Sequence, residues 1–475
     1  MKNIDMSYAP IISDVTIIGG GVSGSSVAAV LAWFTDVQKV TLLEKESVLG
    51  DVNSKATNNS QTLHEGNIES NYTLEKAKKV SYKANILKRY LQNCLPKNTD
   101  VYAMHHKMLV AIWPEQIHLL TKRYKEFLEI FPNDVFLKWH EIAQYEPKVM
   151  EWRNKADMIA AHYSPDGYTI DFGKLSKSFV DYAEQTRKDV VDVFTNAHVK
   201  HIEHKNDIYS VYLDDGRVFQ SKALMVAAWW YTPLLLKQFH KKQPEVQFQY
   251  GDWTTELAVD DFSILSVAGS FFNSKEKVLN GKVYTMQDPD LPFAAVHWDP
   301  EVHDSNITRF WPTALGIPKL ERYRSNAVGD YMKVFEISRK ATDALLFVLK
   351  KDNWKAAKYL FKNTLYEVPY FWKWLFTKEV QKIIPTIKNA DIEKAEWYGG
   401  TRPQILNTTK TSKKWLDFGE AKFQTLDNSA IFTITPSPGA TTCLWNAYTD
   451  VQTLIKSFDG KYTFNKDWFD EMFIK

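Results

Sequence analysis

Short apolar runs rich in β-branched residues stand out in the first part of the chain. Residues 15–18 form one such run, which stops at three glycines, and residues 40–43 form a second, which stops at an acidic residue. A short apolar run bounded by glycine is typical of a strand buried on both faces. The two runs and the residues between them predict a strand–helix–strand unit over 15–44.

The glycines after the first strand have the spacing G-x-G-x-x-G at Gly19, Gly21 and Gly24. Glycine there makes the tight turn, lets the backbone approach a pyrophosphate and lets the helix pack closely on the strand. Glu44 ends the second strand, where an acidic residue binds a ribose hydroxyl. The pattern predicts a dinucleotide site at a helix N-terminus. The alternative is a glycine-rich turn that binds nothing.

Capping residues predict helices in the next part of the chain. Thr73 is an N-cap for a basic helix to about residue 90, and Pro114 opens another helix to about residue 130. Residues 96–165 are expected to form a largely helical insert, with a turn at 164–167. After a helix at 174–186, runs at 199–203, 208–213 and 223–228, with a turn at Asp215-Gly216, predict a hairpin and a buried strand.

The second half of the chain has a different hydrophobic pattern. Residues 245–320 alternate short strand-like runs with turns, as at 263–270 and 281–286, and predict an antiparallel sheet facing the substrate. Near the C-terminus, residues 431–434 predict a strand, followed by the start of a final helix. The expected division is a discontinuous cofactor domain (14–95, 166–235 and 391–475), the helical insert (96–165) and a substrate domain (236–390).

Composition narrows the classes of function. In 475 residues, 59 basic side chains nearly balance 57 acidic ones, so the net charge of +2 gives no reason to expect nucleic acid as a partner. Two cysteines, Cys94 and Cys443, exclude a disulfide framework or a cysteine zinc site and suit a reducing compartment. An intracellular protein is therefore expected. No apolar run is long enough to span a bilayer, so any contact with a membrane is expected to be at its surface.

A basic, aromatic stretch lies within residues 328–385. Its lysines include Lys350, Lys351, Lys355, Lys358 and Lys362, interleaved with leucine, phenylalanine and tyrosine. One interpretation is an interfacial surface for anionic lipid. The other is a solvated helical face.

Four segments resemble FAD-dependent malate:quinone oxidoreductases: 58–79, 281–299, 318–322 and 402–447. They contain Asn-Ser-Gln-Thr-Leu-His, Asn-Tyr-Thr-Leu-Glu-Lys-Ala-Lys-Lys, Leu-Pro-Phe-Ala-Ala-Val-His and Thr-Pro-Ser-Pro-Gly-Ala-Thr-Thr-Cys-Leu. The resemblance implies a fold like that of D-amino-acid oxidase, α/β plus antiparallel β. It also implies FAD as cofactor, malate as hydride donor and a membrane quinone as acceptor. The expected place is the cytoplasmic face of the membrane, bound peripherally.

Site residues follow from the chemistry and from the resemblance. Oxidation of a secondary alcohol needs a base, and we rank His297 first and His64 second. Arg402 is the main candidate for binding a malate carboxylate, with Lys282, Arg309 and Lys319 as weaker ones. Gln61, Thr62, Asn71 and Tyr72 receive no individual role. The expected cofactor contacts are Gly19, Gly21, Gly24, Glu44, Val199, Gly439, Ala440, Thr441 and Thr442, and no metal is expected.

Two further functions stay open from the sequence. One is an L-2-hydroxyglutarate dehydrogenase or oxidase, which shares the histidine phrase and the cofactor. The other is a flavin-binding protein that has lost catalysis.

Glycine and tryptophan counts are unusual. Average usage of about 7% gives about 33 glycines, against 19 observed beside 16 tryptophans. Eight tryptophans fall where the resembled family has glycine: Trp152, Trp229, Trp230, Trp298, Trp311, Trp372, Trp397 and Trp445. One hypothesis is a reassigned stop codon read as glycine and rendered here as tryptophan. Real divergence and a functionally damaged chain are the alternatives.

Overall fold

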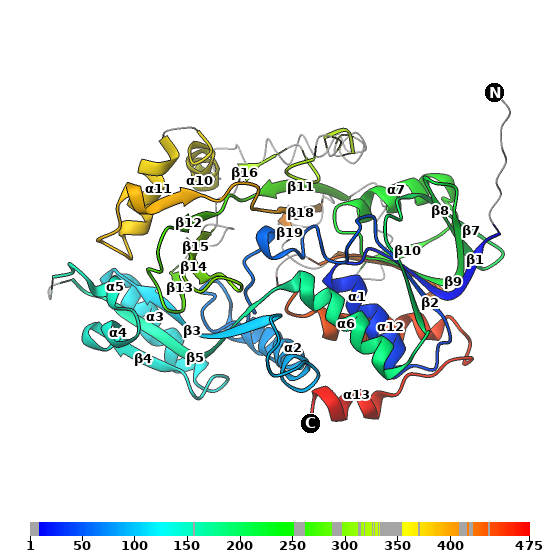
Figure 1. Cartoon of the computed structure of the whole chain (residues 1–475), viewed down its shortest axis with the longest axis horizontal. Helices are drawn as coiled ribbons and strands as arrows, with labels where there is room; N and C mark the ends of the chain where they lie inside the picture. Colours follow the sequence, from blue (N-terminus) through cyan, green and yellow to red (C-terminus); the bar gives the residue numbers. More distant parts are fainter. Residues whose placement is uncertain are drawn as a thin grey trace.

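The computed structural model describes residues 9–154, 157–250, 262–286, 297–311, 315–317, 319–324, 326, 328–330, 332, 354–368, 371–407, 416–417, 421–435 and 438–475. A large sheet lies toward each end of the molecule, and helices pack against both sheets (Figure 1). Residues 287–296 and 333–353, which include Lys350 and Lys351 of the basic stretch, lie outside the described residues.

A nine-stranded sheet with a parallel centre forms one lobe. Its parallel strands are, in spatial order, β21 (Ala430–Ile434), β9 (Val218–Val226), β1 (Ile11–Ile18), β2 (Val40–Leu43) and β6 (Val191–Phe194). All four residues of β2 are buried, as in a strand covered on both faces. The sheet is completed by β10 (Phe248–Tyr250), β20 (Ala421–Thr425), β7 (Val199–Lys205) and β8 (Ile208–Leu213). The predicted Rossmann-like lobe, discontinuous in sequence, is confirmed.

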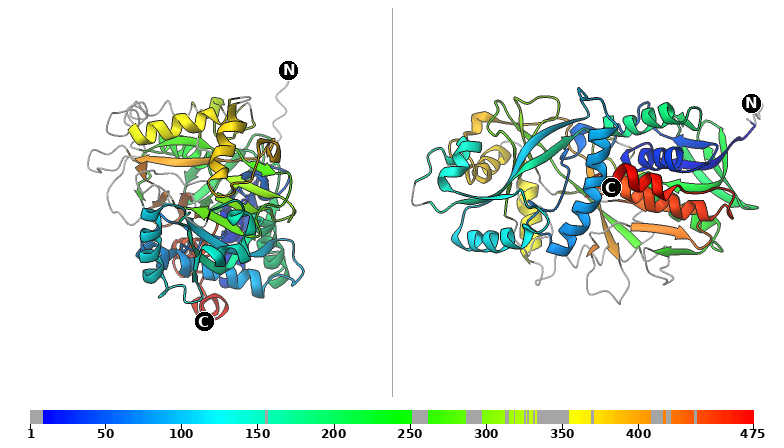
Figure 2. Two further views of the ribbon diagram at one scale, coloured as in Figure 1. Left: turned by 90° about the vertical axis from the view of Figure 1, so that its left-hand side faces the viewer. Right: turned by 90° about the horizontal axis from the view of Figure 1, so that it is seen from below.

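Helices cover both faces of this sheet. One layer comprises α1 (Val22–Phe34), α6 (Phe172–Thr186), α12 (Cys443–Lys456), α2 (Leu74–Asn93) and α13 (Lys466–Phe473). The view from below shows α1 and α12 side by side (Figure 2). On the other face, α7 (Tyr231–Lys242) packs with the β7–β8 hairpin around Phe219 and Phe432. Helix α1 is buried along nearly its whole length, which its small and apolar residues allow.

An eight-stranded sheet forms the other lobe. Its order is β17 (Ile392–Lys394), β12 (Phe272–Ser274), β15 (Thr308–Trp311), β14 (His297–Pro300), β13 (Lys282–Thr285), β3 (Tyr102–Ala111), β5 (Ala160–Ile170) and β4 (Val135–Lys138). All its neighbouring strands are antiparallel except β13 and β3. The antiparallel substrate sheet predicted over 245–320 is therefore present, and strands from elsewhere extend it.

The prediction of a largely helical insert over 96–165 is wrong. Helices α3 (Pro114–Phe127), α4 (Trp139–Tyr145) and α5 (Pro147–Met150) are present, but β3, β4 and most of β5 lie in the same span. The predicted turn at 164–167 lies inside β5, which passes it with a register irregularity opposite His105 and Lys107. Gly167 allows this pairing, because a Cβ there would lie 2.7 Å from the carbonyl oxygen of His105.

A four-stranded sheet and two helices complete the second lobe. The sheet contains β16 (Leu315–Gly316), β11 (Phe262–Ala268), β18 (Thr401–Asn407) and β19 (Leu416–Asp417). Helices α10 (Trp354–Leu365) and α11 (Phe371–Gln381) pack near it and near β12. Short 3-10 turns occur at Ala56–Asn58 and Asn389–Asp391. Among the helices that the structure describes, none is long and apolar enough to cross a membrane.

Several local predictions are confirmed. The Thr73 side chain accepts a hydrogen bond from the backbone N–H of Lys76 at the start of α2, and Pro114 opens α3. The hairpin between β8 and β9 turns at Gly216, whose φ is +90°. Each is a case in which one residue type satisfies a local backbone requirement.

Candidate active site

The turn between β1 and α1 has the geometry of a dinucleotide-binding loop. Gly19 has a φ of +107°, and a Cβ there would lie 2.5 Å from the carbonyl oxygen of Ala227. A Cβ at Gly24 would lie 1.9 Å from the carbonyl oxygen of Gly19, so α1 can pack on the turn only because position 24 is glycine. Gly21 is the residue before α1. These observations fit the roles that the motif assigns to its glycines.

Glu44 lies beside this turn, as predicted. Its carboxylate accepts hydrogen bonds from the backbone N–H groups of Gly20 and Glu46, both at 2.8 Å. Burial raises the pKa of Glu44, and these hydrogen bonds oppose the shift. The backbone N–H of Ala197 donates to the carbonyl oxygen of Glu44, which brings the start of β7, with Val199, to the same edge of the sheet.

The turn between β21 and α12 meets the first glycine turn. The hydroxyls of Ser23 and Thr435 are 3.0 Å apart, and a Cβ at Gly439 would lie 2.3 Å from the carbonyl oxygen of Thr435. Ala440 is partly buried, Thr441 is buried, and Thr442 is the N-cap of α12 without a side-chain capping bond. The N-termini of α1 and α12 therefore lie together, an arrangement that suits the phosphates and electron-rich edge of a dinucleotide.

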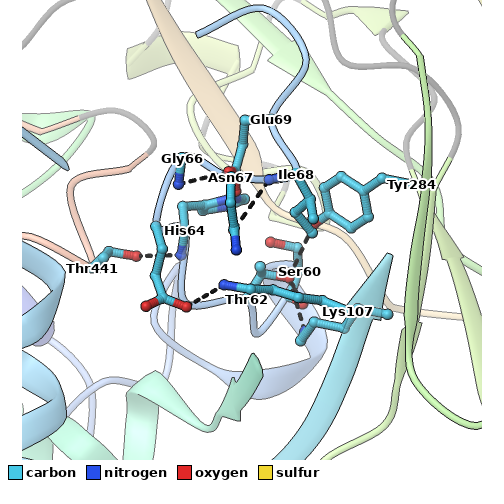
Figure 3. A network of polar contacts seen from close by, with 12 residues as sticks. Ser60, Thr62, His64, Gly66, Asn67, Ile68, Glu69, Lys107, Tyr284 and Thr441 are labelled. Carbon is cyan, nitrogen blue, oxygen red and sulfur yellow. Dashed lines mark hydrogen bonds and ion pairs between the residues drawn. The ribbon is translucent and has the colours of Figure 1, made fainter. Parts of the chain in front are cut away.

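A loop from Ser60 to Glu69 joins this cofactor region to the other lobe (Figure 3). The backbone N–H of His64 donates to Oγ1 of Thr441 at 3.0 Å. Nδ1 of His64 lies 2.7 Å from Oε1 of Glu69, whose other oxygen accepts from the N–H of Gly66 at 2.8 Å. Glu69 therefore fixes the orientation of the His64 ring, which sequence analysis did not foresee.

Glu69 is a carboxylate whose protonation should affect folding. Burial raises its pKa, but the hydrogen bond from His64 and the charges of His64 and Lys107 outweigh burial, and the pKa is lowered from 4.5. A carboxyl group with a depressed pKa in the folded state stabilises the fold above its unfolded pKa, and this stability is lost as the pH falls through the folded value.

We therefore expect Glu69→Gln to be less stable than the wild type at neutral pH. The difference in the free energy of unfolding should be present above about pH 5 and shrink as the pH falls below 4.5, the ordinary value. Urea unfolding at a series of pH values measures it. A difference that grew toward acid pH would contradict this assignment.

Lys282 and Tyr284 on β13, with His297 and Asp299 on β14, form the cross-strand cluster. Residues two apart on a strand share a face, and Tyr284 pairs with His297 across the sheet. The two rings are 4.1 Å apart between centroids. Nζ of Lys282 lies 3.0 Å from Oδ1 of Asp299, whose Oδ2 lies 3.8 Å from Nε2 of His297. All four side chains are buried.

Thr62 connects the cross-strand cluster to the cofactor loop. Its Oγ1 accepts from Nζ of Lys282 at 3.1 Å and from the hydroxyl of Tyr284 at 3.3 Å, and its hydroxyl donates to Oδ1 of Asp299 at 3.1 Å. Because Thr62 and His64 are two residues apart, one short loop touches both the cluster that holds His297 and the segment that holds Thr441. The first two candidate bases thus belong to one connected region.

Arg402 lies within β18. It pairs with Val267 on β11. Its charge acts on Tyr284: burial and the charges of Asp299 and Glu69 raise the pKa of this tyrosine far above 10, and the Thr62 hydrogen bond and the charge of Arg402 oppose the rise. Arg402 is therefore electrostatically coupled to the cross-strand cluster.

Other candidates are engaged elsewhere. Arg309 donates to Ala56 O and to Oε1 of Glu301, both at 3.0 Å, and burial lowers its pKa. Gln61 also hydrogen-bonds to Glu301, and Nζ of Lys319 lies 3.4 Å from the carbonyl oxygen of Arg322. Asn71 is exposed, and the buried Tyr72 ring lies under the ammonium of Lys76. These residues support the site's framework.

Sequence analysis missed Glu69 and Asp299. Asp299 carries a signal in the chain, because His-Trp-Asp at 297–299 and Lys-Val-Tyr at 282–284 each place two polar residues on one face of a strand. A histidine with an acidic residue two positions away on a strand is a candidate oriented imidazole. Glu69 carries no such signal, because it lies in a loop, where side chains do not alternate between two faces.

Comparisons with known proteins define the class first. The fold is similar to L-alpha-glycerophosphate oxidase from Mycoplasma pneumoniae with FAD bound, with a TM-score of 0.61, 20% identity and coverage of 96% of this chain and 97% of that one. The fold is also similar to glycine oxidase from Geobacillus kaustophilus, with a TM-score of 0.59, 14% identity and coverage of 94% of this chain and 95% of that one. With the glycine turns described above, these likenesses define a protein with the fold of FAD-dependent oxidases.

Sequence comparison then gives the family. A profile described as Malate:quinone oxidoreductase (Mqo) matches residues 12–230. A probable malate:quinone oxidoreductase from Campylobacter jejuni is 38% identical over 96% of this chain and 98% of its own. A malate:quinone oxidoreductase from Helicobacter pylori strain J99 is 37% identical, with coverage of 93% and 94%. The chain belongs to the malate:quinone oxidoreductase family, a family of oxidoreductases acting on a CH–OH group.

Proposed function

We propose that this chain oxidises (S)-malate to oxaloacetate with FAD as its bound cofactor and passes the two electrons to a membrane quinone. Family membership over nearly the full chain supports the reaction. The structural observation that carries it is the short loop on which Thr62 contacts the cross-strand cluster and His64 contacts Thr441. When bound, FAD accepts the hydride from the substrate carbon and releases two electrons to the quinone.

The protein's own residues would bind, orient and deprotonate the substrate. Gly19, Gly21, Gly24 and Glu44, with residues 439–442, would hold the cofactor, and Val199 would lie at its edge. His297 would take the hydroxyl proton as the alcohol is oxidised, since imidazole has an ordinary pKa near the working pH. His64, oriented by Glu69, is the second candidate for this role.

Arg402 would bind one malate carboxylate through its planar guanidinium. We expect Arg402→Lys to raise the malate KM about tenfold or more, because an ammonium cannot reproduce two parallel hydrogen bonds. Steady-state assays with a soluble quinone measure it. Arg324→Lys, an exposed arginine paired with Glu46 and Glu321, is the control and should leave the KM unchanged. A wild-type malate KM in Arg402→Lys would remove this role.

Anaerobic mixing with malate tests the function itself. Bleaching of the flavin absorbance by malate, and less by 2-hydroxyglutarate, would support malate oxidation. Faster bleaching by 2-hydroxyglutarate would favour an L-2-hydroxyglutarate dehydrogenase or oxidase. A yellow protein that neither acid bleaches would favour a flavin-binding protein without catalysis.

We further propose that the α10–α11 region lies against the membrane that supplies the quinone. Phe361, Phe371 and Trp374 expose 66%, 64% and 50% of their surface, and the ammonium of Lys378 lies 3.7 Å from the Trp374 ring centroid. Exposed aromatic rings beside lysines suit an anionic interface. Lys362 and Lys382 form ion pairs with Glu379, so part of the positive charge is neutralised within the protein.

Replacing Lys358, Lys373 and Lys378 with glutamine is expected to weaken binding to anionic vesicles, by about fivefold per lysine that lies near the surface. Sedimentation with vesicles at increasing salt measures the loss, and the wild type should be the more salt-sensitive protein. Replacing three lysines of the cofactor lobe, Lys177, Lys188 and Lys466, is the matched control. Equal binding by both triple variants would contradict the proposed surface.

A further inference from the structure

The cross-strand cluster contains a lysine and an aspartate that the proposed reaction does not use directly. Lys282 is 0% and Asp299 2% exposed, on neighbouring strands of the eight-stranded sheet. Burying two opposite charges is expensive, and their attraction offsets the cost only with good geometry and further hydrogen bonds. Here Thr62 donates a hydrogen bond to Oδ1 of Asp299 and accepts one from Nζ of Lys282.

The two carboxylate oxygens of Asp299 have different neighbours. Oδ1 contacts Lys282 and Thr62 at 3.0 and 3.1 Å. Oδ2 faces Nε2 of His297 at 3.8 Å. One oxygen is therefore fixed by the ammonium and a hydroxyl, and the other is held toward the imidazole.

We propose that Asp299 and Lys282 are positioning residues for His297. Asp299 compensates the positive charge that the imidazole gains when it takes a proton, and Lys282 fixes the orientation of the Asp299 carboxylate. The proposal rests on His297 being the base of the proposed reaction, but the coupling of the three groups can be measured without turnover.

The charges around His297 come from several elements. Tyr284 and Lys282 face it from β13, and Asp299 lies on its own strand. Among the described residues, further charged or titratable groups that act on this cluster include His105 and Lys107 from β3, Arg309 from β15, Arg402 from β18 and Glu69 from the cofactor loop. Substitution of Asp299 or Lys282 leaves all of these in place, so a change in His297 can be assigned to the residue substituted.

The two positions should act on His297 in opposite directions. In Asp299→Asn the ammonium of Lys282 remains without its carboxylate, so the imidazolium form is disfavoured and the titration of His297 should move to lower pH. In Lys282→Met the carboxylate acts on His297 alone, and the titration should move to higher pH. A charge at 4–6 Å shifts a pKa by about one unit or more.

NMR of protein with labelled histidine rings provides the measurement, with His297→Asn assigning the resonance. The rate of flavin reduction by malate should fall toward acid pH, and this acid limb of the pH profile should move with the His297 titration in each variant. The double variant Lys282→Met/Asp299→Asn replaces both charges together, so it should titrate near the wild type and fold even if a single variant does not. The exposed pair Lys222 and Asp459 gives matched controls, Lys222→Met and Asp459→Asn.

The outcomes separate the two proposals. Opposite shifts of the His297 titration with matching shifts of the acid limb support both. If the His297 titration shifts in opposite directions but the acid limb of the pH profile of flavin reduction does not move, the coupling of Asp299 and Lys282 to His297 stands. His297 is then not the base of the reaction. Single variants that shift together or not at all, or a double variant that titrates far from the wild type, overturn the positioning role.

A different observation supports a second inference. Among the residues that the structure describes, the non-glycine residues with left-handed φ include Trp152 at +65°, Trp229 at +52° and Trp397 at +64°. The others are Gln61, Asp189, Asn196, Asn206, Asp207, Asn428 and Asp459. Asparagine and aspartate tolerate this backbone, whereas a bulky side chain there is an outlier.

Burial does not offset the backbone cost at two of these positions. Trp152 and Trp397 expose 79% and 72% of their surface. Trp229 follows the segment whose Ala227 carbonyl faces the Gly19 turn, and its Nε1 donates to the carbonyl oxygen of Thr401, next to Arg402, at 3.2 Å. Its indole therefore extends from the cofactor turn to the strand of the proposed substrate arginine.

We infer that residues 152, 229 and 397 are glycine in the protein made by its native cell, read from a reassigned stop codon. All three belong to the eight positions that composition and resemblance singled out, and glycine adopts positive φ without steric cost. Glycine at 229 would leave the region above the Gly19 turn clear for the cofactor.

Peptide sequencing of the protein from its native cells tests this directly. Glycine at 152, 229 and 397 is expected, and tryptophan at these positions would overturn the inference. Recombinant Trp229→Gly provides an independent readout: FAD should bind about tenfold tighter or more than to the tryptophan form. Trp152→Gly, far from the glycine turns in sequence and exposed, is the control. Equal FAD affinity with tryptophan and glycine at 229 would contradict the cofactor argument.

Discussion

The variant His297→Asn is expected to slow flavin reduction by malate by about two to four orders of magnitude, the usual scale of general acid–base catalysis. Asparagine fills similar space but cannot accept the hydroxyl proton. FAD should remain bound, because His297 lies on β14 and the cofactor turns lie in the other lobe. Stopped-flow absorbance under anaerobic conditions measures the rate.

His64→Asn is the comparison that separates the two candidate bases. His64 is oriented by a hydrogen bond of 2.7 Å to Glu69, whereas Oδ2 of Asp299 lies 3.8 Å from Nε2 of His297. If His64→Asn loses the larger factor while His297→Asn reduces flavin at nearly the wild-type rate, the base is His64 and the cross-strand cluster has a supporting role. A loss in His297→Asn alone confirms the first ranking.

The cofactor lobe could be predicted because its signals are local. The spacing of Gly19, Gly21 and Gly24 is fixed by close contacts along one turn, and Glu44 follows from the length of one strand–helix–strand unit. Each requirement involves residues close in sequence. The same holds for the Thr73 cap and the Gly216 turn.

The second lobe was harder because its order depends on distant pairing. Strand β3 begins with Tyr-Ala-Met-His-His-Lys, which has no clear alternation, and it pairs with β13 about 175 residues later in the chain. Because helices α2 and α3 flank β3 in the sequence, the strand was not recognised and its span was assigned to a helical segment. Non-local pairing stabilises a strand whose own sequence does not predict one.

The candidate site likewise combines residues predicted from local sequence with residues whose role depends on distant pairing. Gly439 and Thr441 lie in a recognisable turn, whereas Asp299 acquires its role only because Lys282 lies across the sheet and Thr62 arrives from the cofactor loop. Arg309 and Lys282 looked equivalent in sequence. The structure pairs Arg309 with Glu301 and places Lys282 inside the cross-strand cluster, where it pairs with Asp299.

Glu65, the residue after His64, is expected to be the most costly charge to remove from this loop. It forms ion pairs with Lys107 on β3 and Lys88 on α2, and the Glu65 and Lys107 side chains are only 4% and 2% exposed. Removing one partner of a buried pair leaves an uncompensated charge and costs about 3–5 kcal/mol. Total stabilities are about 5–15 kcal/mol, so Glu65→Leu should be severely destabilised.

Urea unfolding of Glu65→Leu measures this loss, and FAD fluorescence should show weaker cofactor binding because the loop that contacts Thr441 loses its attachment to β3. Glu75→Leu is the matched control, since Glu75 pairs with Lys79 on the exposed face of α2, where such pairs contribute about 0–1 kcal/mol. The double variant Glu65→Leu/Lys107→Met should recover much of the stability, because an apolar pair can replace a buried ion pair. A loss in Glu65→Leu no larger than in Glu75→Leu would show that the ion pairs do not hold the loop.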